Sequence, residues 1–211
     1  MIGHELNNSL APIKSLAATL ATLLTREPRP PDWQEDMERG LSIIAARSES
    51  LIRFMEAYAR LARLPKPRLS AMNVQGWVHR AVSLETRVPI HFANGAEVTL
   101  EADGDQMETL LTNLVRNAAD AALETGGGAR IAWDAADGWL TLRVEDEGPG
   151  LADSGNLFVP FYTTKPGGTG IGLTLCRQIA EAHGGTVTLV NRENARGCVA
   201  TVRLPLAAPR G

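Results

Sequence analysis

Residues 112–122 read "TNLVRNAADAA", and this stretch is the best guide to the fold. It lies in a longer pattern typical of a helix, where Asn113 and Asn117 are four residues apart and therefore share one face. Amide oxygens are hard ligands that suit Mg²⁺, a cation that usually also keeps waters and takes phosphate oxygens. The two asparagines are therefore candidate metal ligands, although two exposed polar residues on a helix would show the same spacing.

A second motif, residues 144–151, reads "VEDEGPGL". Asp146 ends a segment that is apolar at alternate positions, which is typical of a strand. Gly148, Pro149 and Gly150 break that strand and let the backbone lie close to a neighbouring group. A carboxylate in this place can accept a hydrogen bond from an exocyclic amine such as that of adenine. The alternative is an ordinary acidic turn.

A third motif, residues 157–168, reads "LFVPFYTTKPGG". Phe158 and Phe161 flank a proline, and they are followed by two hydroxyl side chains and a cation, Thr163, Thr164 and Lys165. The segment could be a lid that orders over a polyphosphate, or a surface loop with aromatic anchors.

The fourth motif, residues 167–176, reads "GGTGIGLTLC". Gly168, Gly170 and Gly172 precede an apolar helix, so their N–H groups and the helix N-terminus would form a cradle for an anion. The motif is not a Walker A loop, because no "GK[ST]" follows. It is not a Rossmann fingerprint either, since no strand directly precedes it.

In this order and spacing the four motifs resemble the ATP-binding domain of the GHKL superfamily, which contains gyrase-type ATPases, Hsp90-type chaperones, mismatch-repair ATPases and histidine kinases. They match its N box, first glycine box, F box and second glycine box. The resemblance covers about residues 70–206 and includes "EAHGGTV" (181–187) and "RLP" (203–205). It implies that ATP and Mg²⁺ bind, with Asn113 and Asn117 as metal ligands. The implied ATP-binding residues are Asn113, Asn117, Asp146, Gly148, Gly150, Phe158, Thr164, Lys165, Gly168, Thr169, Gly170, Gly172 and Leu173.

The second half of the chain mixes strands and helices without strict alternation, which indicates an α+β fold with helices on one face of a mixed sheet. Period-2 patterns predict strands at residues 97–103, 130–137, 139–146, 185–192 and 198–205. Helical patterns lie between them at residues 75–86, 104–126 and 172–185.

The first 63 residues have a different character. Apolar residues recur at steps of three and four from about Leu6 to Arg63, and a segment with three prolines, residues 25–36, interrupts them. Two helices joined by a short loop make an antiparallel hairpin. A lone hairpin buries too little to be stable, so we expect two copies to form a four-helix bundle. The alternative is that the hairpin packs on its own chain.

The chain begins "MIGHELNNSLAPIKSL", which places His4 and Glu5 at the start of the first helix. With the four ATP-site motifs downstream, "HELNNSLAPIKSL" resembles the H box of sensor histidine kinases, and most closely of those of the nitrogen-regulation type. The resemblance implies that His4 is the phosphoacceptor and that Glu5 orients its imidazole or takes its proton. It also implies that Asn8 serves a phosphatase reaction.

The composition limits which classes of partner and which cellular location are expected. The net charge of −3 gives no basic footprint for nucleic acid. The two cysteines, Cys176 and Cys198, form no CxxC pair, which argues against a disulfide framework or a zinc site and fits a reducing cytosol. No apolar run approaches the roughly 20 residues of a membrane span. We expect a cytoplasmic chain without membrane contact that is the core of a longer sensor.

The sequence therefore predicts three parts: a dimerisation and histidine-phosphotransfer hairpin, a linker and an ATP-binding domain, at residues 1–64, 65–69 and 70–211. The implied function is that of a homodimeric histidine kinase core in a two-component system. It would phosphorylate His4 and pass the phosphoryl group to an aspartate of a response regulator. Two alternatives stay open. One is a GHKL ATPase or a serine kinase of the anti-sigma type, and the other is a dimeric adaptor that only binds nucleotide.

Overall fold

The computed structural model describes residues 2–28, 30–62, 64–93, 95–152, 155–163, 165 and 168–207, without the side chains of residues 2–9, 54, 57 and 60–62. The chain divides into two compact units, Met1–Ala62 and Arg63–Gly211. Among the described residues, none of the helices combines the length and the apolar character that a membrane crossing needs.

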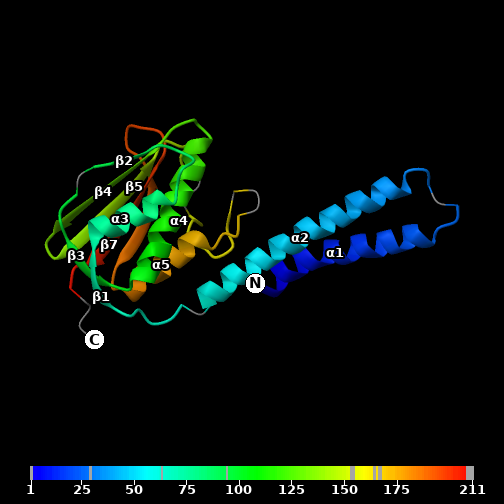
Figure 1. The fold of residues 1–211 in the computed structure, drawn as a ribbon, viewed down its shortest axis with the longest axis horizontal. Coiled ribbons are helices and arrows are strands. Elements are labelled where there is room, and N and C mark those ends of the chain that lie inside the picture. Colours follow the sequence, from blue (N-terminus) through cyan, green and yellow to red (C-terminus); the bar gives the residue numbers. More distant parts are fainter. Residues whose placement is uncertain are drawn as a thin grey trace. The chain divides into compact units, whose positions relative to one another are not determined.

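The first unit is a helical hairpin of α1 (Ile2–Thr25) and α2 (Trp33–Ala62) (Figure 1). As predicted, the three prolines lie between the helices, since α1 ends at Thr25 and α2 begins at Trp33. The contact between the helices centres on Leu20, which is buried, and Gly40. A Cβ atom added to Gly40 would lie 2.7 Å from Leu20 Cδ2, so the missing side chain at Gly40 allows the two helices to approach closely.

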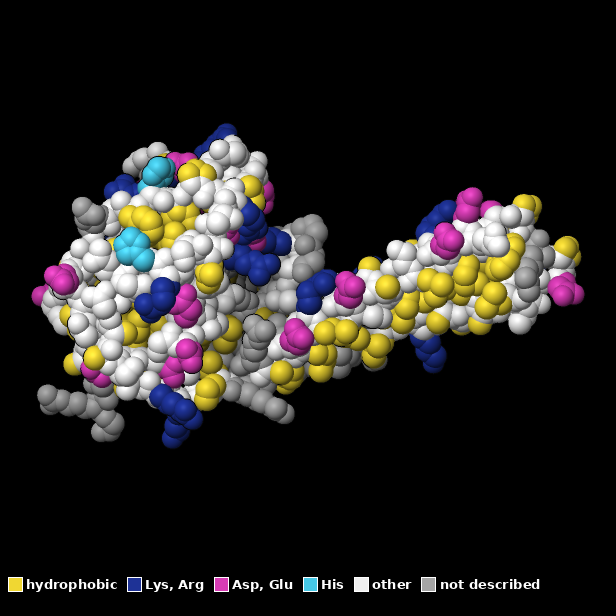
Figure 2. Space-filling model, viewed as in Figure 1, with side chains coloured by type: hydrophobic (Ala, Val, Ile, Leu, Met, Phe, Trp, Pro, Cys, Tyr) yellow, Lys and Arg dark blue, Asp and Glu magenta, His cyan; other side chains and the backbone are white. Residues whose placement is uncertain are grey.

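Much of the apolar surface of the hairpin is not covered within one chain. Figure 2 shows apolar side chains running along the hairpin between charged ones. The large apolar residues exposed there are Leu10, Leu24, Leu41, Ile43, Ile52 and Met55. An apolar surface of this kind commonly marks an interface with another protein.

The second unit is built on a five-stranded sheet with the strand order β2-β4-β5-β7-β6. The strands β2 (Ile90–Phe92) and β4 (Ala129–Ala136) are parallel, whereas β5 (Trp139–Asp146), β7 (Cys198–Pro205) and β6 (Thr186–Asn191) continue the sheet in antiparallel pairs. A separate antiparallel pair is formed by β1 (Ser70–Asn73) and β3 (Thr99–Ala102).

Three helices cover one face of the sheet: α3 (Val74–Ser83), α4 (Gly104–Leu123) and α5 (Gly172–Ala182) (Figure 1). The core lies between these layers and contains Trp77, Leu110, Leu142 and Ile179, all fully buried. Side-chain oxygens cap α3 and α4, because Asn73 accepts from the N–H of Gly76 and Asp103 accepts from that of Gln106.

The predicted α+β class, with helices on one face of a mixed sheet, is confirmed. The five predicted strands and the three helices of this unit are present, with ends shifted by a few residues. Two short strands, β1 and β2, were not predicted. They have four and three residues, too few to show a clear alternation of apolar and polar side chains.

Candidate functional site

The candidate site begins where β5 ends. Alternate residues of β5 are buried against the helices, namely Leu140, Leu142 and Val144, and Asp146 is the next in this register. The alternation that builds the core therefore also places one carboxylate at the end of its buried face. The Asp146 side chain is only 6% exposed.

Backbone groups hold this carboxylate on one side. Its Oδ1 atom accepts hydrogen bonds from the N–H of Gly148 at 2.9 Å and from the N–H of Cys198 at 3.2 Å. Burial raises the pKa of Asp146 above its ordinary value, although these two hydrogen bonds and the charges of Arg192 and Lys165 oppose the rise. Both hydrogen bonds go to Oδ1, and the carboxylate has a second acceptor atom in Oδ2.

The turn after Asp146 lies against two neighbouring elements. A Cβ atom on Gly148 would lie 2.6 Å from the Cβ of Ala121 in α4, so only glycine fits there. The following residues are tied to the end of β6 by Asn191, which accepts from the N–H of Leu151 at 2.6 Å and donates to its carbonyl at 3.0 Å. Gly150, with φ of +86°, lies between these contacts.

The two predicted metal ligands lie on α4, and Asn113 lies beside the start of α5. Asn113 and Asn117 are both partly buried. The Asn113 Nδ2 atom donates to the carbonyl of Thr109 at 2.8 Å, and a Cβ atom on Gly172 would lie 3.1 Å from Asn113 Oδ1. The structure therefore brings Asn113 and the second glycine box together.

The glycine-rich loop leads directly into α5. Gly170 has φ of +65°, and a Cβ atom on it would lie 2.4 Å from the carbonyl carbon of Phe161, whose N–H donates to the Gly170 carbonyl. Residue Ile171 occupies the N-cap position of α5 and makes no side-chain capping bond. The N–H groups of the first turn are thus not used by a capping side chain, and such a helix end favours a phosphate.

The F-box residues have different surroundings. The ring of Phe158 lies under the guanidinium of Arg177 in α5, at 3.9 Å from its centroid, and the Phe158 carbonyl accepts from Thr174 Oγ1. These contacts anchor the segment on α5. Lys165 forms an ion pair with Asp120 of α4, with 2.9 Å between Nζ and Oδ2. Thr164 lies outside the described residues.

The other predicted residues can be placed more briefly. Gly168, Thr169 and Leu173 lie in the glycine-rich loop and the first turn of α5, and the Gly168 N–H donates to the Lys165 carbonyl. His4, Glu5 and Asn8 belong to α1 in the other unit. Their side chains lie outside the described part of the chain.

The donor set at this site suits a hard cation that also takes phosphate oxygens. Within the described ranges, no group of three or more histidine, cysteine, aspartate or glutamate side chains is arranged to hold a metal ion. The amide oxygens of Asn113 and Asn117 are of the kind that Mg²⁺ takes together with water and phosphate oxygens.

A match to a family model agrees with this geometry. Residues 102–208 match the model described as "Histidine kinase-, DNA gyrase B-, and HSP90-like ATPase". The chain belongs to this ATPase family. The matched range contains α4, the turn after β5, the glycine-rich loop and α5, which together form the candidate site.

Curated relatives of the chain include proteins named as sensors and as sensor histidine kinases. The chain is 32% identical to "C4-dicarboxylate transport sensor protein DctS" of Rhodobacter capsulatus, across 97% of this chain and 32% of DctS. It is 30% identical to "Sensory histidine kinase/phosphatase NtrB" of Azospirillum brasilense, across 98% of this chain and 54% of NtrB. The chain thus spans about a third to a half of the length of these curated relatives. The resemblance to sensor histidine kinases is confirmed.

Solved structures support the same fold. The catalytic domain of histidine kinase ThkA aligns with a TM-score of 0.58 and 29% identity, and covers 66% of this chain and 96% of that domain. ThkA in complex with the response regulator protein TrrA aligns over 98% of this chain and 61% of that chain, with a TM-score of 0.71 and 21% identity.

The sequence did not assign a role to several residues around this candidate site. The Cys198 N–H and the Asn191 amide hold Asp146 and the turn after it, although they are 52 and 40 residues away from the groups they bind. Asp120, three residues after Asn117, binds Lys165. Its position within the N-box motif was the one available signal, because residues three apart on a helix share a face.

Proposed function

We propose that the chain is the catalytic core of a two-component sensor histidine kinase, which uses Mg²⁺-ATP to phosphorylate His4. The observation that carries the proposal is the position of the Asp146 side chain. This side chain is a buried carboxylate whose Oδ1 is held by two backbone N–H groups, and the same unit contains a helix N-terminus, that of α5, without a side-chain cap. Membership of the ATPase family and relatives named as sensor histidine kinases, such as NtrB, support the proposal.

The residues of the second unit have distinct tasks in this proposal. Asp146 Oδ2 accepts a hydrogen bond from the exocyclic amine of adenine. The glycine turn at Gly148 and Gly150 lets the base approach the backbone. The N–H groups at the start of α5 bind phosphate oxygens. Asn113 and Asn117 would hold Mg²⁺, which would neutralise charge on the phosphates.

The hairpin supplies the acceptor. A neutral imidazole of His4 has one nitrogen free to attack the γ-phosphorus, while Glu5 accepts the N–H of the other nitrogen. A bond forms between the imidazole nitrogen and phosphorus, the bond from phosphorus to the bridging oxygen breaks, and ADP leaves. The proton from the other nitrogen passes to Glu5. The phosphoryl group then moves to a carboxylate oxygen of a response-regulator aspartate.

Labelling with γ-³²P-ATP tests the proposal. We expect the wild-type chain to form a phosphoprotein that is labile in acid and stable in alkali, and His4→Gln to bind ATP but form none. Glu5→Gln should be labelled roughly 10²–10⁴-fold more slowly, as expected for the loss of one general base. An acid-stable phosphoprotein would instead support a serine kinase. ATP hydrolysis without any phosphoprotein would support a simple ATPase, and binding without either would support an adaptor.

Phosphatase activity toward the regulator is a further part of the proposal. Asn8 lies one helical turn after His4 in α1, so the two residues share a face of the helix. Its amide can orient a water for attack on an aspartyl phosphate. We expect Asn8→Ala to be phosphorylated and to transfer normally, but to leave the phosphorylated regulator with a longer lifetime than the wild type does. An equal lifetime with both proteins would remove this role.

A further inference from the structure

A row of four charged side chains with alternating sign runs from the loop after α3 to the F-box segment. Arg87 binds Glu85 with 2.6 Å between NH2 and Oε2, and binds Asp120 with 2.8 Å between NH1 and Oδ1. Asp120 in turn binds Lys165 through its other oxygen, Oδ2, at 2.9 Å. This row of charges connects α4, which carries the predicted metal ligands, with a segment predicted to cover the phosphates.

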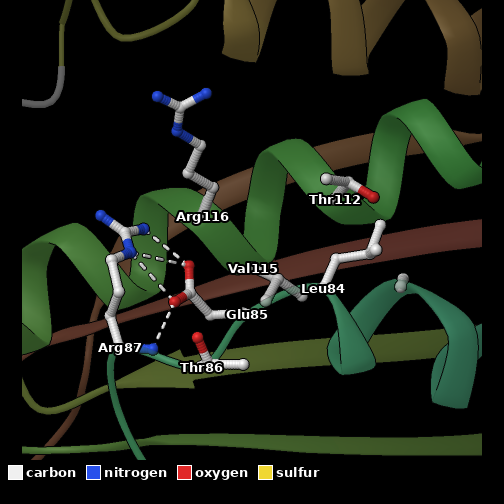
Figure 3. Close-up of a pocket in the computed structure, with 8 residues that line it drawn as sticks. Leu84, Glu85, Thr86, Arg87, Thr112, Val115 and Arg116 are labelled. Atoms are coloured by element: carbon white, nitrogen blue, oxygen red, sulfur yellow. Dashed lines mark hydrogen bonds and ion pairs between the residues drawn. The ribbon is translucent and has the colours of Figure 1, made fainter.

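Glu85 and Arg87, the first two residues of this row, line a hollow of about 500 Å³ between α3 and α4. Figure 3 shows the Arg87 guanidinium reaching both carboxylate oxygens of Glu85, while the Arg116 side chain extends away from them. The Glu85 side chain is only 9% exposed, although that of Arg87 is 43% exposed, and the two Glu85 oxygens accept from both Nε and NH2 of Arg87. Arg87 is therefore well held when it binds Asp120.

We propose that Asp120 is a positioning residue for ATP binding, which holds the ammonium group of Lys165 beside the face of α4 that carries Asn113 and Asn117. Asp120 follows these asparagines by seven and three residues, and such positions lie on one helix face. The inference rests on the proposed function, because it assigns the phosphates of ATP as the ligand of that ammonium.

The geometry favours positioning over sequestration of the lysine. An ammonium group has three N–H donors, and the bond to Asp120 uses one of them, so phosphate oxygens can take the others without breaking the pair. Arg87 neutralises Asp120 through Oδ1, so the carboxylate does not depend on Lys165 alone. Burial opposes the charge of Asp120, yet the hydrogen bonds from Lys165 and Arg87 outweigh it and lower the pKa of Asp120. Asp120 is thus a stable anion at neutral pH.

Holding the lysine in advance should strengthen binding. A free lysine side chain loses much rotamer freedom when it binds a ligand, and a partner that has already ordered it reduces this loss. Removal of the carboxylate should therefore weaken the affinity for ATP through Lys165. Adenosine, which has no phosphates, should bind equally well with or without it.

A double-mutant cycle tests the inference by calorimetric titration of the full chain with Mg²⁺-ATP and with adenosine. We expect Asp120→Asn to weaken ATP binding by roughly threefold to tenfold, a range typical of coupled neighbours, and to leave adenosine binding unchanged. In a Lys165→Gln background, Asp120→Asn should have no further effect. Asp120→Glu, which keeps the charge, should recover part of the loss.

Control variants separate the possible failures. Asp134→Asn removes the carboxylate of another exposed ion pair, the one between Asp134 and Arg143 at 2.7 Å, and should leave both affinities unchanged. Unchanged or tighter ATP binding by Asp120→Asn, or effects that add in the double variant, would overturn the positioning role. A wild-type chain that binds neither ligand would instead contradict the proposed function. If Asp120→Asn does not fold, Asp120→Ser, which also removes the carboxylate, takes its place in the cycle.

Discussion

At the scale of single residues, Asp146 shows which part of the site is visible in the sequence. The alternation of β5 and the glycine turn after it predicted a carboxylate at the end of a strand, and the structure places Asp146 there. The partner of that carboxylate could not be predicted, because Cys198 is 52 residues away and its N–H reaches Asp146 only through the pairing of β5 with β7. The same holds for the contact between Arg87 and Asp120, which are 33 residues apart.

The substitution Asp146→Asn should separate stability from nucleotide binding. The amide oxygen can keep both hydrogen bonds from Gly148 and Cys198, but Nδ2 then replaces Oδ2 and presents a donor where the adenine amine needs an acceptor. We expect the affinity for ATP to fall by roughly tenfold to a hundredfold, as for one unsatisfied buried group. Titration with a fluorescent ATP analogue measures this change, and wild-type affinity in the variant would contradict the assigned role.

The same variant should change the pH dependence of stability. Because burial raises the pKa of Asp146 in the folded chain, the protonated form favours folding, and this stabilisation is lost as the pH rises through the raised pKa. Asparagine has no such loss. Melting temperatures should therefore be similar at a pH below the ordinary aspartate pKa, and the variant should melt higher than the wild type at pH 7. Thermal melts across this range would show a constant difference if the carboxylate were not involved.

At the scale of elements, periodicity predicted the long strands and helices but not how they pair. The sheet order β2-β4-β5-β7-β6 arises from contacts distant in sequence, and no local pattern contains it. The glycine-rich loop is a mixed case. Its role as an anion cradle was readable from three glycines before a helix, whereas the close contact between Gly170 and the Phe161 backbone depends on the folded loop.

Two alanine substitutions distinguish the conformation of a glycine from its packing. Gly126 and Gly170 have similar φ angles, +69° and +65°, but a Cβ atom meets nothing within 4 Å at Gly126 and meets the Phe161 backbone at Gly170. Both variants should lose about 1–2 kcal/mol from the left-handed conformation. We expect Gly170→Ala alone to displace the loop and to weaken ATP binding by roughly tenfold or more. Equal affinities in the two variants would show that the loop does not shape the phosphate site.

At the scale of the whole molecule, the two units differ in how much of their apolar surface they bury. The second unit has a buried core of its own, whereas the hairpin leaves large apolar side chains exposed. We infer that a second copy of the hairpin covers them, because two copies would form the four-helix bundle predicted from the sequence.

A charge on the exposed apolar face should break the proposed dimer. Leu41 is 54% exposed in the single chain, so Leu41→Asp costs the monomer little but would bury an unpaired charge in a bundle. Ala46→Asp places the same charge five residues later, about 140° around α2, and serves as the control. Sedimentation should report monomers for Leu41→Asp and dimers for Ala46→Asp. A stable Leu41→Asp dimer would place the interface elsewhere.

The last prediction concerns the separate roles of the two units, ATP binding in the second and the phosphoacceptor histidine in the first. A full chain carrying Asp146→Asn keeps His4 but should bind ATP poorly, while residues 64–211 produced alone keep the ATP site and lack the histidine. Mixed together, they should label the full chain at His4, and the rate should rise linearly with the concentration of the added unit. The tether in the intact chain gives an effective concentration on the order of millimolar, so labelling with about 10 μM added unit should be roughly a hundredfold slower than in the wild type. Phosphoprotein detection on a gel separates the two chains by size. A complete lack of label, with ATP binding by residues 64–211 intact, would mean that the second unit acts on His4 only through the covalent connection between them.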